Sequence, residues 1–213
     1  MSAAAGGAGE RVGILGGAFN PPHVGHLVLA QEAHARLALD RVLLVPFGQA
    51  PHRAVEDDPG RDERLALARL AAGGDERLGT SAIEVDRPGP SYMADTLDLL
   101  RQTETAIEPT LILGADQARR LRTWHAPERV LAAARVAVAE RDGIGREEVV
   151  AGLDGLSGAE AIEGFAMPRI DVSSTLIRAR VAAGLPIRYL VPDAVAERIA
   201  DRGLYREPAG RAP

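Results

Sequence analysis

The sequence contains no cysteine and no lysine, and each absence restricts the chemistry available to the chain. Without cysteine there is no disulfide framework and no thiolate to serve as a nucleophile or metal ligand, which is compatible with the reducing cytoplasm in which we expect this protein. Because all 25 basic residues other than histidine are arginines, any cationic contact to a phosphate must come from a planar, permanently charged guanidinium.

Long apolar runs and a positive net charge are also missing. No apolar segment approaches the length needed to span a membrane, and the first ten residues lack the apolar core of a signal peptide. The formal net charge of −5 argues against a broad nucleic-acid-binding surface. We therefore expect neither a membrane nor a nucleic acid as a partner. A small anionic substrate would need cationic groups gathered at one place.

Length and composition favour one globular domain. A chain of 213 residues with 46% hydrophobic and 26% charged residues can bury a large core. We expect residues 11–205 to form a single domain whose C-terminal part (about 173–205) is helical. Residues 1–10 and 206–213 are expected to form tails, the first of them flexible.

The most informative segment is residues 11–26, which read RVGILGGAFNPPHVGH. It begins with a short apolar run that is typical of a buried strand. Gly16 and Gly17 follow this run, and glycines there allow the backbone to pass close to a ligand. The apolar spacing beyond His23 predicts a helix, so that His23 and His26 lie three residues apart on one face of its first turn.

This arrangement is suited to a phosphate. The N-terminus of a helix offers unpaired N–H groups and the positive end of the helix dipole, and two imidazoles add further donors. The simpler alternative is that His23 is a turn residue and His26 a solvated helix residue. A metal site is disfavoured because the chain has no cysteine and few other histidines to complete a ligand set.

The rest of the chain alternates between predicted strands and helices. A helix from about Val24 to Ala38, followed by the apolar strand 41–46, completes a βαβ unit, which implies a parallel sheet with a right-handed crossover. Further strands are predicted at 80–86, 110–114, 134–140 and 165–172. Further helices are predicted at 61–72, after an N-cap at Ser91, in a short stretch from 145, from Ser173 to Gly184, and within 189–205.

The segment GGAFNPPHVGH resembles the GGTFDPxHxGH signature of the nucleotidyltransferase superfamily that carries a His-x-Gly-His element. Within this superfamily the whole chain resembles the bacterial nicotinate-nucleotide adenylyltransferases. Ala18 stands where threonine is usual, and Asn20 stands where aspartate is common. The resemblance implies a Rossmann-like doubly wound α/β sheet with a small C-terminal helical portion.

Other segments match this family in the expected order: FGQAPHR (47–53), GPSYMADTL (89–97), GAD (114–116) and SSTLIR (173–178). Arg53 replaces a lysine of the family pattern, and Met93 replaces a threonine. The family places the GAD segment on the ATP side, at the carboxyl end of its strand. It places a tryptophan, here Trp124, against the pyridine ring of the second substrate.

The resemblance implies transfer of an adenylyl group from ATP to nicotinate mononucleotide in NAD biosynthesis, with Mg²⁺ carried mainly by the ATP phosphates. His23, His26 and Arg178 are the expected catalytic residues. The expected ATP-binding residues are Gly16, Gly17, Ala18, Phe19, His23, His26, Gly114, Asp116, Ser173, Ser174, Thr175 and Arg178. The expected mononucleotide-binding residues are Asn20, His52, Arg53, Ser91, Tyr92, Met93, Thr96 and Trp124.

Several alternatives stay open. Taken alone, Asp116 could be a helix cap, Trp124 a core residue and the 47–53 segment a solvated loop. The substrate could instead be nicotinamide mononucleotide or phosphopantetheine, although the 89–97 segment and Trp124 favour a pyridine ring. A non-catalytic nucleotide-binding protein on the same scaffold is disfavoured by the intact histidine pair and Arg178. The sequence is compatible with a homo-oligomer.

Overall fold

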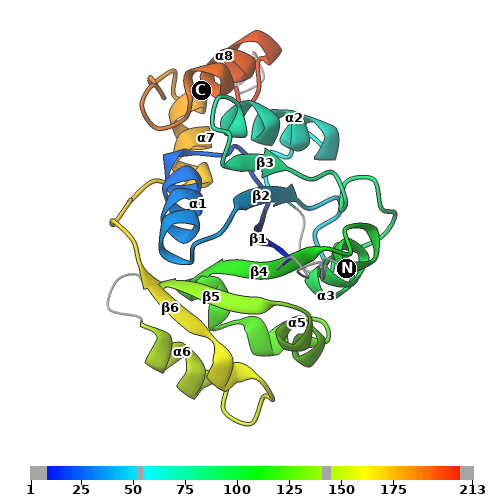
Figure 1. Ribbon diagram of the computed structural model, residues 1–213. Helices are drawn as coiled ribbons and strands as arrows, with labels where there is room; N and C mark the ends of the chain where they lie inside the picture. The colour runs from blue at the N-terminus through cyan, green and yellow to red at the C-terminus, as the bar shows by residue number, and fades with distance from the viewer. Residues whose placement is uncertain (1–8, 52–54, 141–144, 207–213) are drawn as a thin grey trace, which may run out of the picture.

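The computed structural model describes residues 9–51, 55–140 and 145–206, which form a six-stranded sheet (Figure 1). The strand order is β3-β2-β1-β4-β5-β6, and neighbouring strands pair in parallel. The strands are β1 (Glu10–Gly17), β2 (Arg41–Pro46), β3 (Leu78–Thr80), β4 (Ile107–Gly114), β5 (Arg135–Glu140) and β6 (Glu163–Ala166). The order reverses between β1 and β4, which confirms the predicted doubly wound α/β sheet.

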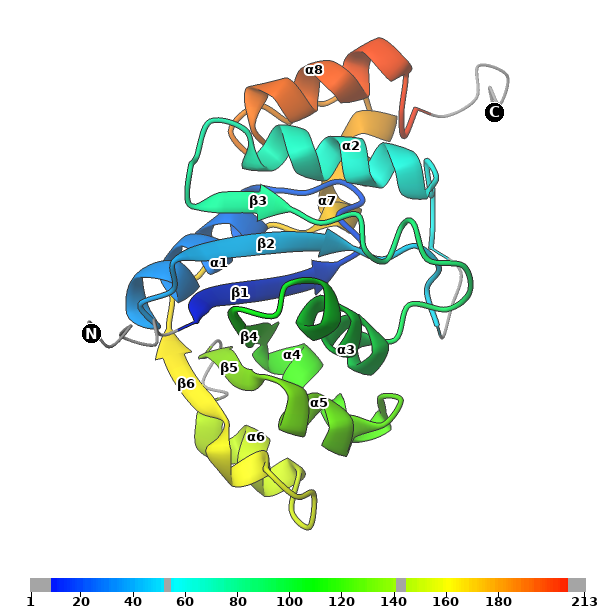
Figure 2. The same cartoon turned by 45° about the vertical axis from the view of Figure 1, so that its right-hand side comes forward.

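Helices cover both faces of this sheet, with α1 and α3 on opposite sides (Figures 1 and 2). The helices are α1 (Val24–Arg36), α2 (Arg61–Ala72), α3 (Met93–Thr103), α4 (Ala115–Ala118), α5 (Pro127–Ala133), α6 (Arg146–Gly152), α7 (Ser174–Ala182) and α8 (Asp193–Arg202). The predicted bounds of α2 agree with those observed. The closing helix begins after Pro192 and ends at Gly203, where φ is +61°, as expected for a glycine at a helix C-terminus.

Two apolar cores follow from the alternation of side chains along the strands. Val12 and Ile14 of β1 pack into a cluster with residues of α3, α5 and α6. Leu15 packs into the other cluster, which contains Ala30 and Ala33 of α1. The strand interiors therefore read as continuous apolar runs because both faces of the sheet are covered.

A third apolar cluster attaches the C-terminal helices to α2. It contains Leu67 of α2, Ile177 of α7 and Val195 of α8. The Glu63 carboxylate accepts hydrogen bonds of 2.6 and 2.9 Å from the Arg198 guanidinium and so joins α2 to α8. This packing carries α7 back to the loop that follows β1, although the two are far apart in the sequence.

Two strand predictions are wrong in their extent. The segment 80–86 is not a strand, because β3 ends at Thr80 and the chain then turns. This turn buries two consecutive residues, Glu84 and Val85, so burial in the segment does not alternate as it would in a strand with one exposed face. The strand predicted at 165–172 ends at Ala166, which pairs with Glu140 at the end of β5.

Smaller differences affect the ends of elements. Ser91 is not the N-cap of α3, because Tyr92 occupies that position. Glu10, expected in the N-terminal tail, is the first residue of β1, while 1–8 and 207–213 lie outside the described residues. In the described part of the chain, none of the helices combines the length and apolarity needed to cross a membrane.

Candidate active site

The site begins where β1 and β4 part. β1 pairs with β4 as far as Ile14, opposite Leu111. Beyond that point β1 continues to Gly17 in pairing with β2, and β4 continues to Gly114 in pairing with β5. The carboxyl ends of two adjacent parallel strands thus face the place where open α/β sheets bind ligands.

The start of α3 lies against this end of β1. A Cβ at Gly16 would lie 2.8 Å from Cε of Met93, so the glycine makes room for the methionine side chain. Met93 also packs against the core cluster on that face of the sheet. The segment expected to bind ATP phosphates and the segment expected to bind the pyridine therefore meet directly.

The two predicted histidines lie at the mouth of α1. His23 is the N-cap residue, and its backbone N–H donates to Nδ1 of His26 at 3.2 Å. The two ring centroids are 3.8 Å apart, and the Phe19 ring lies 5.0 Å from His26 on another side. A Cβ at Gly25 would lie only 3.0 Å from Nδ1 of His23, which explains the glycine between the histidines.

This packing sets the protonation of His26. Shielding from solvent lowers the pKa of His26 well below its usual value of 6.5, and the neighbouring charge of His23 lowers it further. His26 is therefore neutral at pH 7. Because its Nδ1 accepts the backbone hydrogen bond, the single ring proton is on Nε2, which is a donor suitable for a phosphate oxygen.

The α7 end of the site is tied to the loop after β1. Ser174 donates its hydroxyl to the Pro21 carbonyl at 2.8 Å, across 153 residues of sequence. Ser173 caps α7 by accepting from the Leu176 N–H at 3.1 Å. Thr175 is exposed on the first turn. The predicted neighbourhood of the histidine loop and the SSTLIR segment is thus present.

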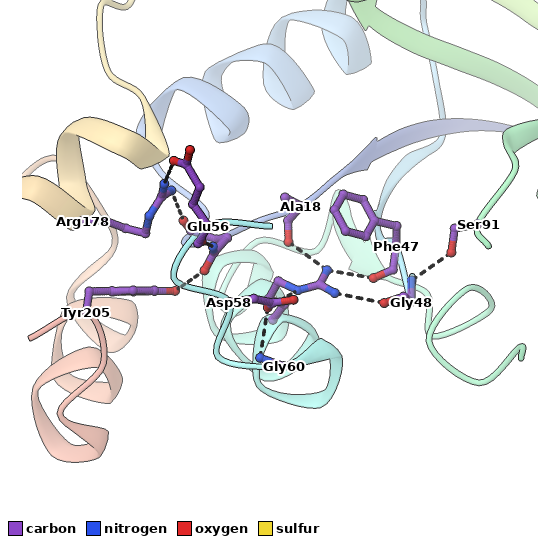
Figure 3. A network of polar contacts seen from close by, with 11 residues as sticks. Ala18, Phe47, Gly48, Glu56, Asp58, Gly60, Ser91, Arg178 and Tyr205 are labelled. Carbon is purple, nitrogen blue, oxygen red and sulfur yellow. Dashed lines mark hydrogen bonds and ion pairs between the residues drawn. The ribbon is translucent and has the colours of Figure 1, made fainter. Parts of the chain in front are cut away.

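Arg178 lies one turn further along α7 and is engaged by the protein itself. Its Nη1 donates to the Asn20 carbonyl at 3.1 Å. Its Nε lies 3.2 Å from a carboxylate oxygen of Asp57. Its Nη2 lies 3.3 Å from a carboxylate oxygen of Glu56 (Figure 3). The guanidinium is thus surrounded by acceptors from two different loops.

Asn20, expected near the mononucleotide, is buried and joins three segments. Its Nδ2 donates to the Glu56 carbonyl and its Oδ1 accepts from the Tyr205 hydroxyl, each at 2.8 Å. Burial raises the pKa of Tyr205 above its usual value, so the hydroxyl stays protonated and able to donate. Asn20 therefore connects the loop after β1 to the turn that contains Glu56 and to Tyr205, which follows α8.

The residues expected at the pyridine differ in burial: Tyr92 and Trp124 are partly buried, and Thr96 is fully buried. The Tyr92 ring is half-buried, 4.3 Å from the His125 ring. Thr96 is buried and donates its hydroxyl to Glu84 at 2.7 Å, and burial raises the pKa of this carboxyl. Trp124 is partly buried against the core cluster that contains α3 and α5.

Gly114 and Asp116 lie at the carboxyl end of β4. Gly114 is the N-cap of the short helix α4, and nothing lies within 4 Å of a Cβ built there. Asp116 is exposed in the first turn of α4, and the cap itself is Gly114. His52 and Arg53 lie outside the described residues. Their roles, like those of the other assigned residues, stay predictions.

Comparisons with known proteins agree with this geometry. Residues 14–180 match the cytidylyltransferase-like family model. A relative named "Probable nicotinate-nucleotide adenylyltransferase" from Roseiflexus sp. (strain RS-1) is 44% identical over 206 residues, covering 92% of this chain and 98% of the relative. A relative of the same name from Herpetosiphon aurantiacus is 41% identical over 200 residues, with coverage of 92% and 98%. The chain belongs to the nicotinate-nucleotide adenylyltransferase family.

Membership of this family makes the protein a nucleotidyltransferase, as the resemblance predicted. The fold agrees with a solved structure described as Plasmodium falciparum nicotinic acid mononucleotide adenylyltransferase complexed with NaAD. The TM-score is 0.75 at 13% identity, and the match covers 92% of this chain and 97% of the other. At that identity the likeness concerns the fold.

Sequence reasoning missed two residues that organise this nicotinate-nucleotide adenylyltransferase site. Arg64 is buried, and its guanidinium donates to the carbonyls of Phe47 and Gly48 at 2.7 and 3.1 Å (Figure 3). A signal was available, because Arg64 shares a face of α2 with the buried Leu67 and Ala71. A charged residue in an apolar stripe needs internal partners.

Gly48 is the second missed residue. Its N–H donates to the Ser91 hydroxyl at 2.9 Å, and the Ser91 N–H donates to the Gln49 carbonyl at the same distance. A Cβ at position 48 would lie 2.2 Å from the Glu84 carbonyl oxygen. Ser91 thus holds the loop after β2 through two hydrogen bonds, to Gly48 and Gln49, and does not cap α3.

In the ranges that the structure describes, no group of three or more histidine, aspartate or glutamate side chains is placed to hold a metal ion.

Proposed function

We propose that this enzyme transfers the adenylyl group of ATP to nicotinate mononucleotide, releasing nicotinate adenine dinucleotide and pyrophosphate, as a cytoplasmic step of NAD biosynthesis. The observation that carries the proposal is the gathering of the histidine pair, Ser174 and Arg178 around residues 20–21, at the point where β1 and β4 part. The names of the relatives at 44% and 41% identity support the same substrate pair.

The reaction requires alignment more than proton transfer. An oxygen of the mononucleotide phosphate bonds to the α-phosphorus of ATP, the bond to the bridging oxygen breaks, and its electron pair leaves with pyrophosphate. Because the attacking oxygen is already anionic, no general base is needed. Catalysis then comes from holding the two phosphates in line and stabilising the charge that develops between them.

The histidines supply donors at the reacting phosphates. His26 is neutral, with its proton held on Nε2, so it can donate to a phosphate oxygen throughout the neutral pH range. The N-terminus of α1 adds its dipole at the same place. The neighbouring His23 ring, tilted by 35° with its centroid 3.8 Å away, restricts the orientation of His26.

Arg178 and Ser174 serve the β- and γ-phosphates of ATP. A guanidinium can bind phosphate oxygens in a bidentate manner, and the backbone N–H groups of the first turn of α7, which begins at Ser174, complement it. Mg²⁺ arrives as part of the ATP substrate, since this ion keeps several waters and phosphate oxygens and needs few protein ligands. Asp116, exposed after β4, is suited to the ribose of ATP.

The pyridine carboxylate is placed at the start of α3. The first-turn N–H groups of a helix of 11 residues favour an anion there. Met93 fixes this helix end against Gly16, and Trp124 offers a ring for the pyridine. The NH₂ group of a neutral amide would face the N–H donors of α3 and leave both without an acceptor, which disfavours nicotinamide mononucleotide.

One assay distinguishes the candidate reactions. Pyrophosphate release from ATP is measured with nicotinate mononucleotide, nicotinamide mononucleotide and phosphopantetheine in turn. The proposal expects the highest kcat/KM with nicotinate mononucleotide. Release with phosphopantetheine alone would assign the chain to a different acceptor, and no release with any of them would overturn adenylyl transfer to these acceptors.

A further inference from the structure

Arg64 is a buried cation at the meeting point of three loops. Its side chain is only 1% exposed. Besides the Phe47 and Gly48 carbonyls, Nη1 lies 3.3 Å from the Ala18 carbonyl and Nε lies 2.9 Å from Oδ1 of Asp58. The guanidinium also lies 4.5 Å from the centre of the Phe47 ring. A group so enclosed is not placed to contact a substrate.

The loops that Arg64 joins are the ones expected to hold the two substrates. Ala18 belongs to the loop that runs from β1 to the histidine pair. Phe47 and Gly48 open the loop after β2, which leads toward the segment assigned to the mononucleotide. The Gly48 N–H donates a hydrogen bond to the hydroxyl of Ser91, which precedes α3. One guanidinium thus joins the loops that follow β1 and β2, just beyond the Gly17–Pro46 pair that ends the ladder of these strands.

We propose that Arg64 is a positioning residue for adenylyl transfer, which sets the distance between the ATP loop and the mononucleotide loop without touching either substrate. The inference rests on the proposed function, because that function assigns a substrate to each loop. In-line displacement is sensitive to such spacing, and a shift of about 1 Å can lower the rate about 100-fold. Lysine cannot replace the arginine, since its ammonium lacks the planar fork that reaches several carbonyls at once.

The test compares Arg64→Lys with Arg69→Lys, a matched change at an exposed arginine of the same helix. Both variants are assayed well below their melting temperatures, with correct folding checked by circular dichroism. We expect Arg64→Lys to lower kcat at least about tenfold at saturating substrates, while each KM changes less than about threefold. Arg69→Lys should behave as the wild type.

A purely structural role would give a different pattern. In that case Arg64→Lys would melt at a lower temperature but retain kcat within twofold of the wild type, which would overturn the inference. A rise in one KM with kcat unchanged would also overturn it, because it would indicate a binding contact. If the wild type and Arg69→Lys release no pyrophosphate with any acceptor, the proposed function itself fails and the inference fails with it.

Ser91→Ala keeps the inference testable if Arg64→Lys does not fold. This change releases Gly48 from the α3 side and leaves Arg64 in place. We expect kcat to fall more than either KM rises. If both single variants fold, the double variant should lose less than the product of the two losses, because both act on Gly48. Unchanged kcat in Ser91→Ala, where it is the variant that folds, would overturn the inference.

Discussion

The Nε atom of Arg178 lies 3.2 Å from Oδ2 of Asp57, and its Nη2 lies 3.3 Å from a carboxylate oxygen of Glu56. The guanidinium is 10% exposed, whereas the Glu56 and Asp57 side chains are 81% and 66% exposed. The cation assigned to the ATP phosphates is thus paired with two exposed carboxylates of the chain itself, which lie on the turn before α2. Phosphate oxygens must compete with these carboxylates for the same donors.

Removing the two carboxylate charges should therefore strengthen ATP binding. An ion pair with an exposed partner contributes about 0.2–1 kcal/mol, so we expect Glu56→Gln/Asp57→Asn to lower the Kd for a non-hydrolysable ATP analogue about two- to tenfold. Asp62→Asn is the matched control, since it removes an exposed charge from the first turn of α2. The gain should shrink at high ionic strength because screening weakens exposed pairs.

The Arg178→Ala variant separates this competition from a general charge effect. Arg178→Ala alone should weaken the ATP analogue more than the mononucleotide. In that background the Glu56→Gln/Asp57→Asn change should have little further effect, since the competed cation is gone. Weaker ATP binding after Glu56→Gln/Asp57→Asn would instead mean that the carboxylates orient Arg178 for its ligand.

His26→Ala should reduce turnover without unfolding the protein. Loss of one donor to a charge that develops in the transition state typically costs about 100-fold or more in kcat. The variant should still melt cooperatively, because α1 remains anchored by Ala30 and Ala33 in the core. His34→Ala, on the last turn of the same helix, is the matched control. Near wild-type turnover of His26→Ala would remove this imidazole from the chemistry.

The lowered pKa of His26 also predicts how stability depends on pH. The folded state holds the ring neutral, whereas the unfolded chain binds a proton near pH 6.5. The unfolded state therefore binds more protons below that pH. The stabilisation is complete above about pH 6.5 and is lost as the pH falls toward the folded-state pKa. We expect the melting temperature to fall less between pH 7.5 and 5.5 in His26→Asn than in the wild type, and parallel curves would contradict this.

Much of the fold was accessible from the sequence because its signals are local. Glycine pairs, apolar runs and helical spacing identified β1, α1 and the bounds of α2. The wrong strand at 80–86 has a physical cause: its partly alternating apolar residues lie in a turn, which buries the consecutive residues Glu84 and Val85. Apolar alternation alone does not reveal whether a partner strand is present.

The site was predictable only in its parts that resemble a motif. The contacts that join those parts cross long stretches of sequence, such as Tyr205 to Asn20 over 185 residues. No local sequence pattern predicts that Ser91 accepts a hydrogen bond from Gly48 or that Glu56 pairs with Arg178. The Glu56–Arg178 pairing depends on how α2, α7 and α8 pack together, which only the tertiary structure specifies.

The choice between acid and amide tests the proposed placement of the pyridine at the start of α3. Nicotinate mononucleotide carries a carboxylate where nicotinamide mononucleotide carries a neutral amide. In the proposed site, the start of α3 would present N–H donors to that substituent. An amide there leaves groups unpaired, at a cost of about 1–3 kcal/mol for each, so kcat/KM should favour the acid by at least about tenfold. Met93 contributes no hydroxyl and instead holds the helix end over Gly16, so Met93→Thr should change this ratio little if the backbone donors decide it. Both ratios are measured at saturating ATP. Equal values for the two mononucleotides in the wild type would overturn the acid preference and leave adenylyl transfer standing.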